Sequence, residues 1–81
     1  MRLPRDLSGE ELARTLSALG YVVARQSGSH MRLTTHEHGE HHLTIPRHAS
    51  LRVGTIAAIL ADVADHFGLS REALFERLFA G

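Results

Sequence analysis

The chain contains no cysteine, no lysine and no long apolar run, and these absences limit the kinds of site and the classes of protein that fit the sequence. Without cysteine, neither a disulfide nor a thiolate metal site can form. No segment approaches the ~18 apolar residues that a membrane span needs, and the N-terminal stretch lacks the apolar core of a secretory signal. We therefore expect a soluble, cytoplasmic protein without a membrane partner. Its length fits one small domain, residues 1–81, with one core.

An excess of charge of one sign is also missing, because nine basic side chains balance nine acidic ones. The net charge therefore does not indicate a polyanionic partner. The distribution is uneven: between Tyr21 and Arg52, four arginines face only two glutamates, and six of the seven histidines lie in this region. All nine basic residues are arginine, which favours forked contacts with phosphate or carboxylate. A base-composition bias in the genome would explain the absence of lysine equally well.

The apolar pattern predicts one helix, three strands and two further helices. A capping box at Ser8 and Glu11 opens a helix over 9–19, which Gly20 ends. Strands are expected at 21–26, 30–35 and 41–45, a longer helix with an apolar stripe at Val53, Ile56, Leu60, Val63 and Phe67, and a short last helix capped by Ser70. The expected fold class is α+β, in the order α-β-β-β-α-α, with helices packed on one face of a three-stranded antiparallel sheet.

The stretch Gln26–His48 contains the last two strands and is the part on which the fold and the chemistry depend. Alternation places apolar side chains on a covered face and polar ones on an open face. The covered set is Met31, Leu33, Leu43 and Ile45, and the open set is His30, Arg32, Thr34, His42 and Thr44. Pro46 is expected to stop the pairing of the last strand.

The histidines first suggest zinc, which needs three or four converging ligands. His41 and His42 are adjacent on a strand and point to opposite faces, and no H-E-x-x-H motif occurs. We therefore predict no metal and no cofactor, and interpret these histidines as solvated turn residues. Nucleophilic catalysis by Ser29 is also disfavoured, because it lies outside any G-x-S-x-G motif and its neighbour diverges from it.

General acid–base chemistry at His30 is the better-supported alternative. Gly28 and Ser29 form a turn before it, and Arg32 shares its predicted face. A histidine can move a proton to or from a ribose 2′-hydroxyl or a leaving 5′-oxygen. Neighbouring arginines could hold the phosphate and stabilise its developing charge. A lone histidine on a strand is nevertheless more often simply solvated.

Several motifs together resemble the HicA (YcfA-like) toxin family of bacterial toxin–antitoxin systems. They are Gly28-Ser29-His30 at the start of a strand, Thr44-Ile45-Pro46-Arg47-His48 at the end of the next, Val53-Gly54-Thr55-Ile56 with Ile59-Leu60, and the tail Gly68-Leu69-Ser70-Arg71-Glu72-Ala73-Leu74-Phe75. The resemblance implies a double-stranded-RNA-binding-domain-like fold, cleavage of messenger RNA and a HicB-type antitoxin partner. It also implies that His30 is catalytic and that Pro46 and His48 lie at the rim of the site.

Two features depart from the family pattern: many members have a lysine where this chain has Ser27, and many are clearly basic whereas this chain has no net charge. Either Arg25, Arg32 and Arg47 supply the missing charge, or this copy is a weak or specialised nuclease. Backbone binding scales with the number of phosphates neutralised, so the difference bears on RNA affinity.

From these observations we predict the toxin of a type II toxin–antitoxin system, a metal-independent endoribonuclease with His30 as general acid or base. The RNA- and phosphate-binding residues are predicted to be Gly28, Ser29, Arg32, Arg47 and His48. The expected partners are single-stranded or messenger RNA and a HicB-type antitoxin, in a homodimer or a toxin–antitoxin hetero-oligomer. A second acid–base group could come from His42, His48 or the substrate.

Two alternatives from other classes remain. A non-catalytic RNA-binding module of the same fold would bind RNA without cleaving it. A protein-interaction domain would use its open sheet face or an edge strand to pair with a partner chain.

Overall fold

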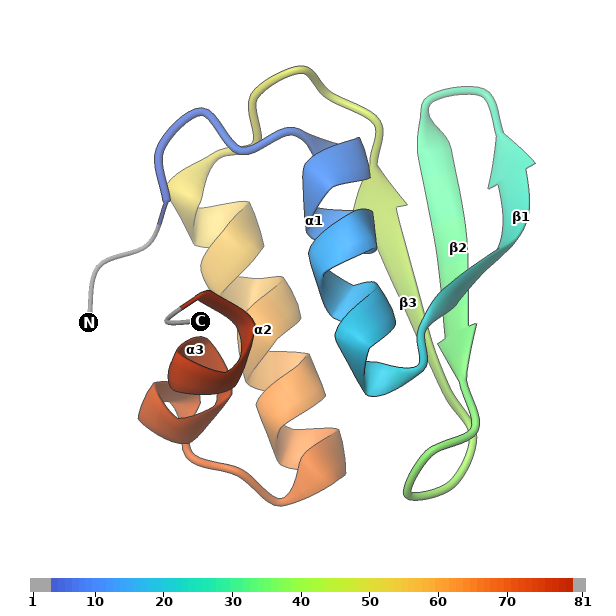
Figure 1. The fold of residues 1–81 in the computed structure, drawn as a ribbon. Helices are drawn as coiled ribbons and strands as arrows, with labels where there is room; N and C mark the ends of the chain where they lie inside the picture. The colour runs from blue at the N-terminus through green and yellow to red at the C-terminus, as the bar shows by residue number, and fades with distance from the viewer. Residues whose placement is uncertain (1–3, 80–81) are drawn as a thin grey trace.

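In the computed structural model, which describes residues 4–79, one helix precedes three strands and two helices follow them (Figure 1). The elements are α1 (Gly9–Leu16), a 3-10 helix η1 (Ser17–Leu19), β1 (Val22–Ser27), β2 (His30–Thr35), β3 (His41–Pro46), α2 (Val53–Phe67) and α3 (Arg71–Phe79). The strands pair antiparallel in the order β1-β2-β3. The predicted α+β fold is confirmed, while residues 1–3 and 80–81 of the predicted domain lie outside the described residues.

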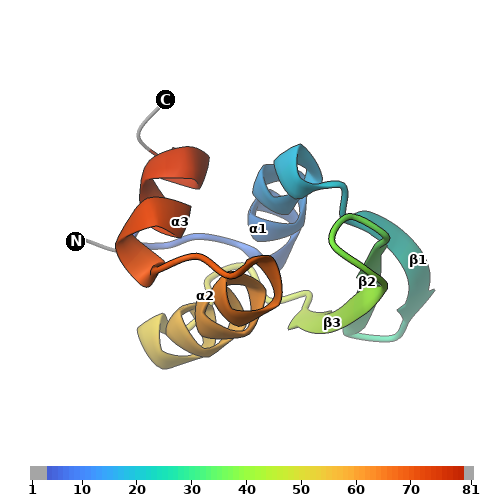
Figure 2. The ribbon, with the colours of Figure 1, turned by 90° about the horizontal axis from the view of Figure 1, so that it is seen from below.

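The helices cover one side of the sheet and leave the other side open. α1 and α2 lie next to the strands, and α3 packs on the side of the helices away from the sheet (Figures 1 and 2). The core fills the space between them and is built from Leu12, Ala13, Leu16, Leu19, Tyr21, Met31, Leu33, Leu43, Ile45, Leu51, Ile56, Ile59, Leu60, Val63, Ala64, Phe67 and Leu74. The predicted covered set of the two strands is thus buried as expected.

The start and the end of the first helical segment follow the predicted capping rules. The Glu11 N–H donates to Ser8 Oγ at 3.0 Å, and the Ser8 N–H donates to Glu11 Oε1 at 2.9 Å. The hydrogen bond from the Ser8 N–H, and then the Ser8 side chain, lower the pKa of the Glu11 carboxyl group, because they favour its ionised form. Gly20 ends η1 with a φ of 83°, and an added Cβ there would stand 2.8 Å from Thr35 Oγ1. Glycine is therefore required at this position by conformation and by space.

Two expectations are corrected. Val53 is 56% exposed, because it is the first residue of α2 and extends past the core. Thr34 is only 9% exposed, although its register partner His42 lies on the open face. The expectation for Pro46 is confirmed, because β3 and its pairing end at this residue, which lies opposite His30. Just beyond the strand, the Arg47 N–H donates to Ser29 O at 2.6 Å. A proline is tolerated here because β3 is an edge strand.

No single described helix is long and apolar enough to cross a bilayer. The helices α2 and α3 reach the length and composition of a span only when they are taken together, and the chain bends by 104° between them.

Candidate functional site

His30 is the first residue of β2 and follows a two-residue hairpin turn. Of the two turn residues, only Gly28 has a positive φ, 55°, which matches the type II′ turn with glycine in first position. No atom would contact a Cβ on Gly28, so its backbone conformation, rather than a close approach, requires glycine. The His30 side chain is exposed, and its Nδ1 lies 3.5 Å from Ser29 Oγ.

The end of β3 supports this turn from the neighbouring strand. Pro46 lies opposite His30, and the bond from the Arg47 N–H to Ser29 O fixes the turn to the segment that follows β3. The backbone that presents His30 is therefore held on both sides. His48 is exposed in the same segment.

The N-terminus of α1 is seated against this segment. The Gly9 N–H donates to His48 O at 3.0 Å, and a Cβ on Gly9 would overlap Pro46 O. Sequence reasoning did not identify Gly9 as part of the site, since a glycine at a helix start has many explanations. Its close approach depends on a contact with a distant segment, which no local pattern reveals.

The side chain of Arg47 is turned towards α1. Its Nη2 lies 3.6 Å from Glu10 Oε2. Pro46 lies opposite His30, so Pro46 and His30 are on the same face of the sheet, and Arg47 is the next residue after Pro46. Alternation then directs Arg47 to the other face. Arg32, in contrast, is two residues from His30 on β2, and it is exposed. Of the two predicted phosphate contacts, Arg32 shares the face of His30 and Arg47 is paired with Glu10.

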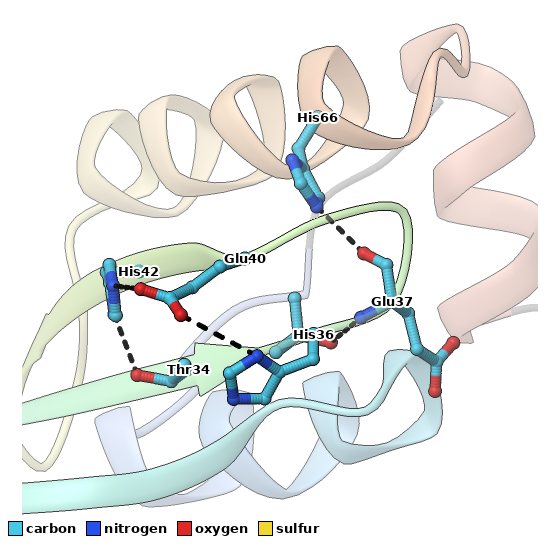
Figure 3. Close-up of polar contacts among 7 residues, drawn as sticks. Thr34, His36, Glu37, Glu40, His42 and His66 are labelled. Carbon is cyan, nitrogen blue, oxygen red and sulfur yellow. Dashed lines mark hydrogen bonds and ion pairs between the residues drawn. The ribbon is translucent and has the colours of Figure 1, made fainter.

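At the other end of the open face, His42 belongs to a hydrogen-bonded cluster with Thr34 and Glu40 (Figure 3). Its Nε2 lies 2.9 Å from Glu40 Oε2, and its Nδ1 lies 2.8 Å from Thr34 Oγ1. A carboxylate only accepts, so Nε2 carries the proton that His42 donates to Glu40. The second oxygen of Glu40 is 3.7 Å from His36 Nδ1. This cluster explains why Thr34 is buried on a face that is otherwise open.

The distance along β2 decides whether His42 can assist His30. His42 lies opposite Thr34, which is four residues from His30. At 3.2–3.4 Å per residue this is about 13 Å. Proton transfer requires each group to lie within about 3 Å of the reacting oxygen. His42 is therefore at the far end of the open face from His30, with both ring nitrogens engaged by Glu40 and Thr34.

His41 faces the helices instead, as strand alternation predicts. Its Nδ1 lies 2.7 Å from the Tyr21 hydroxyl, its Nε2 lies 3.2 Å from Asp62 Oδ1, and its ring stacks on His66 at 4.4 Å. Burial, and to a smaller extent Asp62, raise the pKa of Tyr21 to about 12. His66 in turn donates from Nε2 to Glu37 O at 2.9 Å (Figure 3). The interpretation of these histidines as solvated turn residues is wrong for His41, which joins β3 to α2.

Within residues 4–79, no three His, Cys, Asp or Glu side chains are grouped so as to hold a metal ion. A groove of about 440 Å³ lies between α1 and the edge strand β1. It is lined by Glu10, Ala13, Arg14, Ser17, Tyr21, Val22, Val23, Gln26 and Met31. His30 does not line it, so the candidate site is an exposed face rather than this groove.

The structure thus brings together an exposed histidine, a rigid turn and an arginine on one open sheet face. A proton donor or acceptor beside a cation is suited to reactions in which an oxygen nucleophile attacks a phosphate. Gly28 and Ser29 contribute the turn and Arg32 the nearby charge, and His48 is exposed two residues after Pro46.

Comparison with known proteins agrees with the resemblance seen in the motifs. Residues 9–64, more than half of the chain, match a family model described as the HicA toxin of bacterial toxin-antitoxin. The matched range runs from the start of α1 into the last turn of α2 and includes His30, whereas α3 lies outside it. No curated protein and no solved structure gives a significant match.

Proposed function

The chain belongs to the HicA toxin family of bacterial toxin–antitoxin systems, and we propose that it acts as a metal-independent endoribonuclease on messenger RNA, with His30 as general acid or base. The toxin role follows from the family. The observation that supports the catalytic role is the exposed His30 side chain on a turn whose backbone is fixed to the end of β3. A group held in this way can meet a substrate without reorganising.

The proposed reaction is attack of a ribose 2′-oxygen on the adjacent phosphorus, with loss of the 5′-oxygen of the next nucleotide. The P–O2′ bond forms as the P–O5′ bond breaks, which yields a cyclic phosphate and a free 5′-hydroxyl. His30 either accepts the proton of the 2′-hydroxyl or donates one to the leaving 5′-oxygen. Arg32, exposed on the same face, would give the RNA backbone a cationic contact beside the reacting phosphate.

The partner of His30 in proton transfer is then His48 or the substrate. His42 is less well placed, because its backbone lies about 13 Å away along the strand and its ring is held by Glu40 and Thr34. His48 is exposed in the segment whose backbone meets the His30 turn, so it is the protein group better placed for this role.

An antitoxin partner is implied by the family, and we propose that it is a HicB-type protein that covers the open sheet face. Binding there would bury His30 and Arg32 together and so exclude RNA. The edge strand β1 offers a second line of contact next to this face, because all six of its residues are exposed, including Val22 and Val23.

The test is to incubate the purified chain with labelled single-stranded RNA in EDTA. The wild type should cleave, and His30→Ala should reduce the cleavage rate at least about 100-fold, the usual share of a general acid or base. His36→Ala is a matched control, since His36 is also exposed but lies beyond the far end of β2. It should cleave normally.

The melting temperature separates a catalytic role from a structural one. His30 is exposed and makes one long polar contact, so His30→Ala should melt within about 1–2 °C of the wild type. Equal cleavage by wild type and His30→Ala would overturn the assignment. RNA binding without cleavage by either protein would favour the non-catalytic binding module.

A further inference from the structure

The edge strand β1 contains an irregularity that changes which of its side chains face the open side of the sheet. Val23 lies opposite Leu33, but Arg25 lies opposite Arg32, so Ala24 has no partner on β2. This two-against-one count defines a β-bulge. Without it, residues 23 and 25 would share one face. With it, Val23 lines the groove beside α1 while Arg25 shares the face of its partner Arg32.

The bulge therefore places two arginines directly opposite each other on adjacent strands. Like charges in this position destabilise a sheet. Arg25 and Arg32 are both exposed, and within residues 4–79 neither guanidinium lies within 4.0 Å of a carboxylate. Because no carboxylate offsets this repulsion among the described residues, the two guanidinium groups form a site suited to an anion. Bulges that re-aim a side chain are frequent beside active sites.

We propose that Arg25 and Arg32 together bind one backbone phosphate of the RNA, next to the phosphate at which His30 acts. This inference rests on the proposed function and assigns Arg25 a role in it. His30 and Arg32 are two residues apart on one face, about 7 Å along β2. The arginine pair is therefore offset from the reacting bond, and its effect is on substrate binding.

The chemistry favours phosphate as the ligand. Two guanidinium groups provide planar, forked donors that match phosphate oxygens, and their charge is fixed at all physiological pH values. Arg47, the other candidate, is already paired with Glu10 at 3.6 Å, whereas Arg25 is unpaired among the described residues. Arg25 thus supplies the second arginine that Arg47 was expected to supply.

The experiment measures RNA binding and cleavage in parallel for full-length variants. Binding of a labelled single-stranded RNA is followed over a series of salt concentrations in a His30→Ala background, so that the probe stays intact. Arg25→Gln and Arg32→Gln should each weaken binding about tenfold and make the salt dependence shallower by at most about 0.7, the slope that one phosphate of a single strand contributes. Arg71→Gln is the matched control, because Arg71 is exposed at the start of α3, away from the sheet (Figure 2). It should change neither quantity.

Cleavage kinetics are then measured with His30 intact, to show whether the arginines act on substrate binding or on the chemical step. Arg25→Gln should raise KM about tenfold and leave kcat within about twofold, as expected for loss of ground-state binding. The melting temperature of Arg25→Gln should equal or exceed that of the wild type, because a like-charge pair is removed. A structural arginine would behave in the opposite way and lower it.

The outcomes distinguish this inference from the proposed function. If the wild type cleaves RNA but Arg25→Gln has the KM and salt slope of Arg71→Gln, the arginine-pair site is wrong and the nuclease stands. If Arg25→Gln instead loses affinity for the antitoxin alone, the pair recognises an acidic protein surface and the phosphate assignment is also wrong. If the wild type neither binds nor cleaves RNA, both proposals fail.

Discussion

The two adjacent histidines at the start of β3 have unrelated roles, because successive residues of a strand point to opposite faces. His41 lies among Tyr21, Asp62 and His66 and joins the sheet to α2. His42 is on the open face with Glu40 and buries Thr34 beneath it. A single insertion or deletion before this pair would exchange the two positions and disrupt both clusters.

The buried hydroxyl of Tyr21 gives the first prediction at this scale. Its pKa is raised to about 12 from an ordinary value of 10.0, so the folded state favours the neutral form. The unfolded chain then ionises first as the pH rises. This contribution to stability is fully present below pH 10 and is lost between about pH 10 and 12, at up to about 1.4 kcal/mol per pH unit.

A spectrophotometric titration of tyrosinate absorbance tests this directly, because the chain has a single tyrosine. The midpoint should lie near pH 12 in the folded protein and near 10 in denaturant. Tyr21→Phe should show a flatter dependence of unfolding free energy on pH across this range. A midpoint near 10 in the folded protein would contradict the burial of the hydroxyl.

Single residues were predictable where alternation alone decides their direction. The covered and open faces of β2 and β3 follow from the period of two, and so does the divergence of His41 and His42. The burial of Thr34 was not predictable, since it depends on a hydrogen bond with a neighbour on the next strand. The pairing of Arg47 with Glu10 likewise depends on where α1 lies.

Among the elements, α1 matters most for the candidate site because its first residue touches the end of β3. Gly9→Ala should destabilise the protein by about 1–3 kcal/mol, since the added Cβ overlaps Pro46 O and the neighbouring backbone must move. It should also lower RNA cleavage, because the segment that moves supports the His30 turn. Denaturant unfolding and the cleavage assay measure the two effects.

The control for this variant is Gly54→Ala in the first turn of α2. A Cβ on Gly54 would meet no atom within 4 Å, so alanine should be neutral or should stabilise by up to about 1 kcal/mol. Alanine is the better helix former at both positions. Gly9→Ala should lower the free energy of unfolding, whereas Gly54→Ala should leave it unchanged or raise it. A stabilising Gly9→Ala would show that the approach of α1 to β3 is not tight.

The elements themselves were largely predictable, with boundaries within a residue or two for the strands. Caps at Ser8 and Ser70 and glycines at 20 and 68 mark the helix ends in the sequence and in the structure. The bulge at Ala24 was not predictable, because no glycine or proline marks it. It results from the register that the turn at Gly28 and the covered residues of β2 impose together.

For the whole molecule, the net charge of zero limits how strongly RNA can be bound through its backbone. On the open face, Arg25 and Arg32 would share one phosphate, and the phosphate at His30 would be a second contact. For a single strand, at about −0.7 per phosphate, the logarithm of the binding constant should then fall with the logarithm of salt concentration with a slope between about −0.7 and about −1.4. A slope steeper than about −4 would show that RNA contacts far more of the surface than this face.

The contacts around His30 also set the order in which the site can form during synthesis. The turn at Gly28 and Ser29 is local, but the bonds that hold it come from Arg47, and the bond that places Gly9 comes from His48. A growing chain that ends before these residues contains His30 but has nothing to fix its position. The backbone around His30 is therefore held in place only once the segment that follows the third strand has been synthesised.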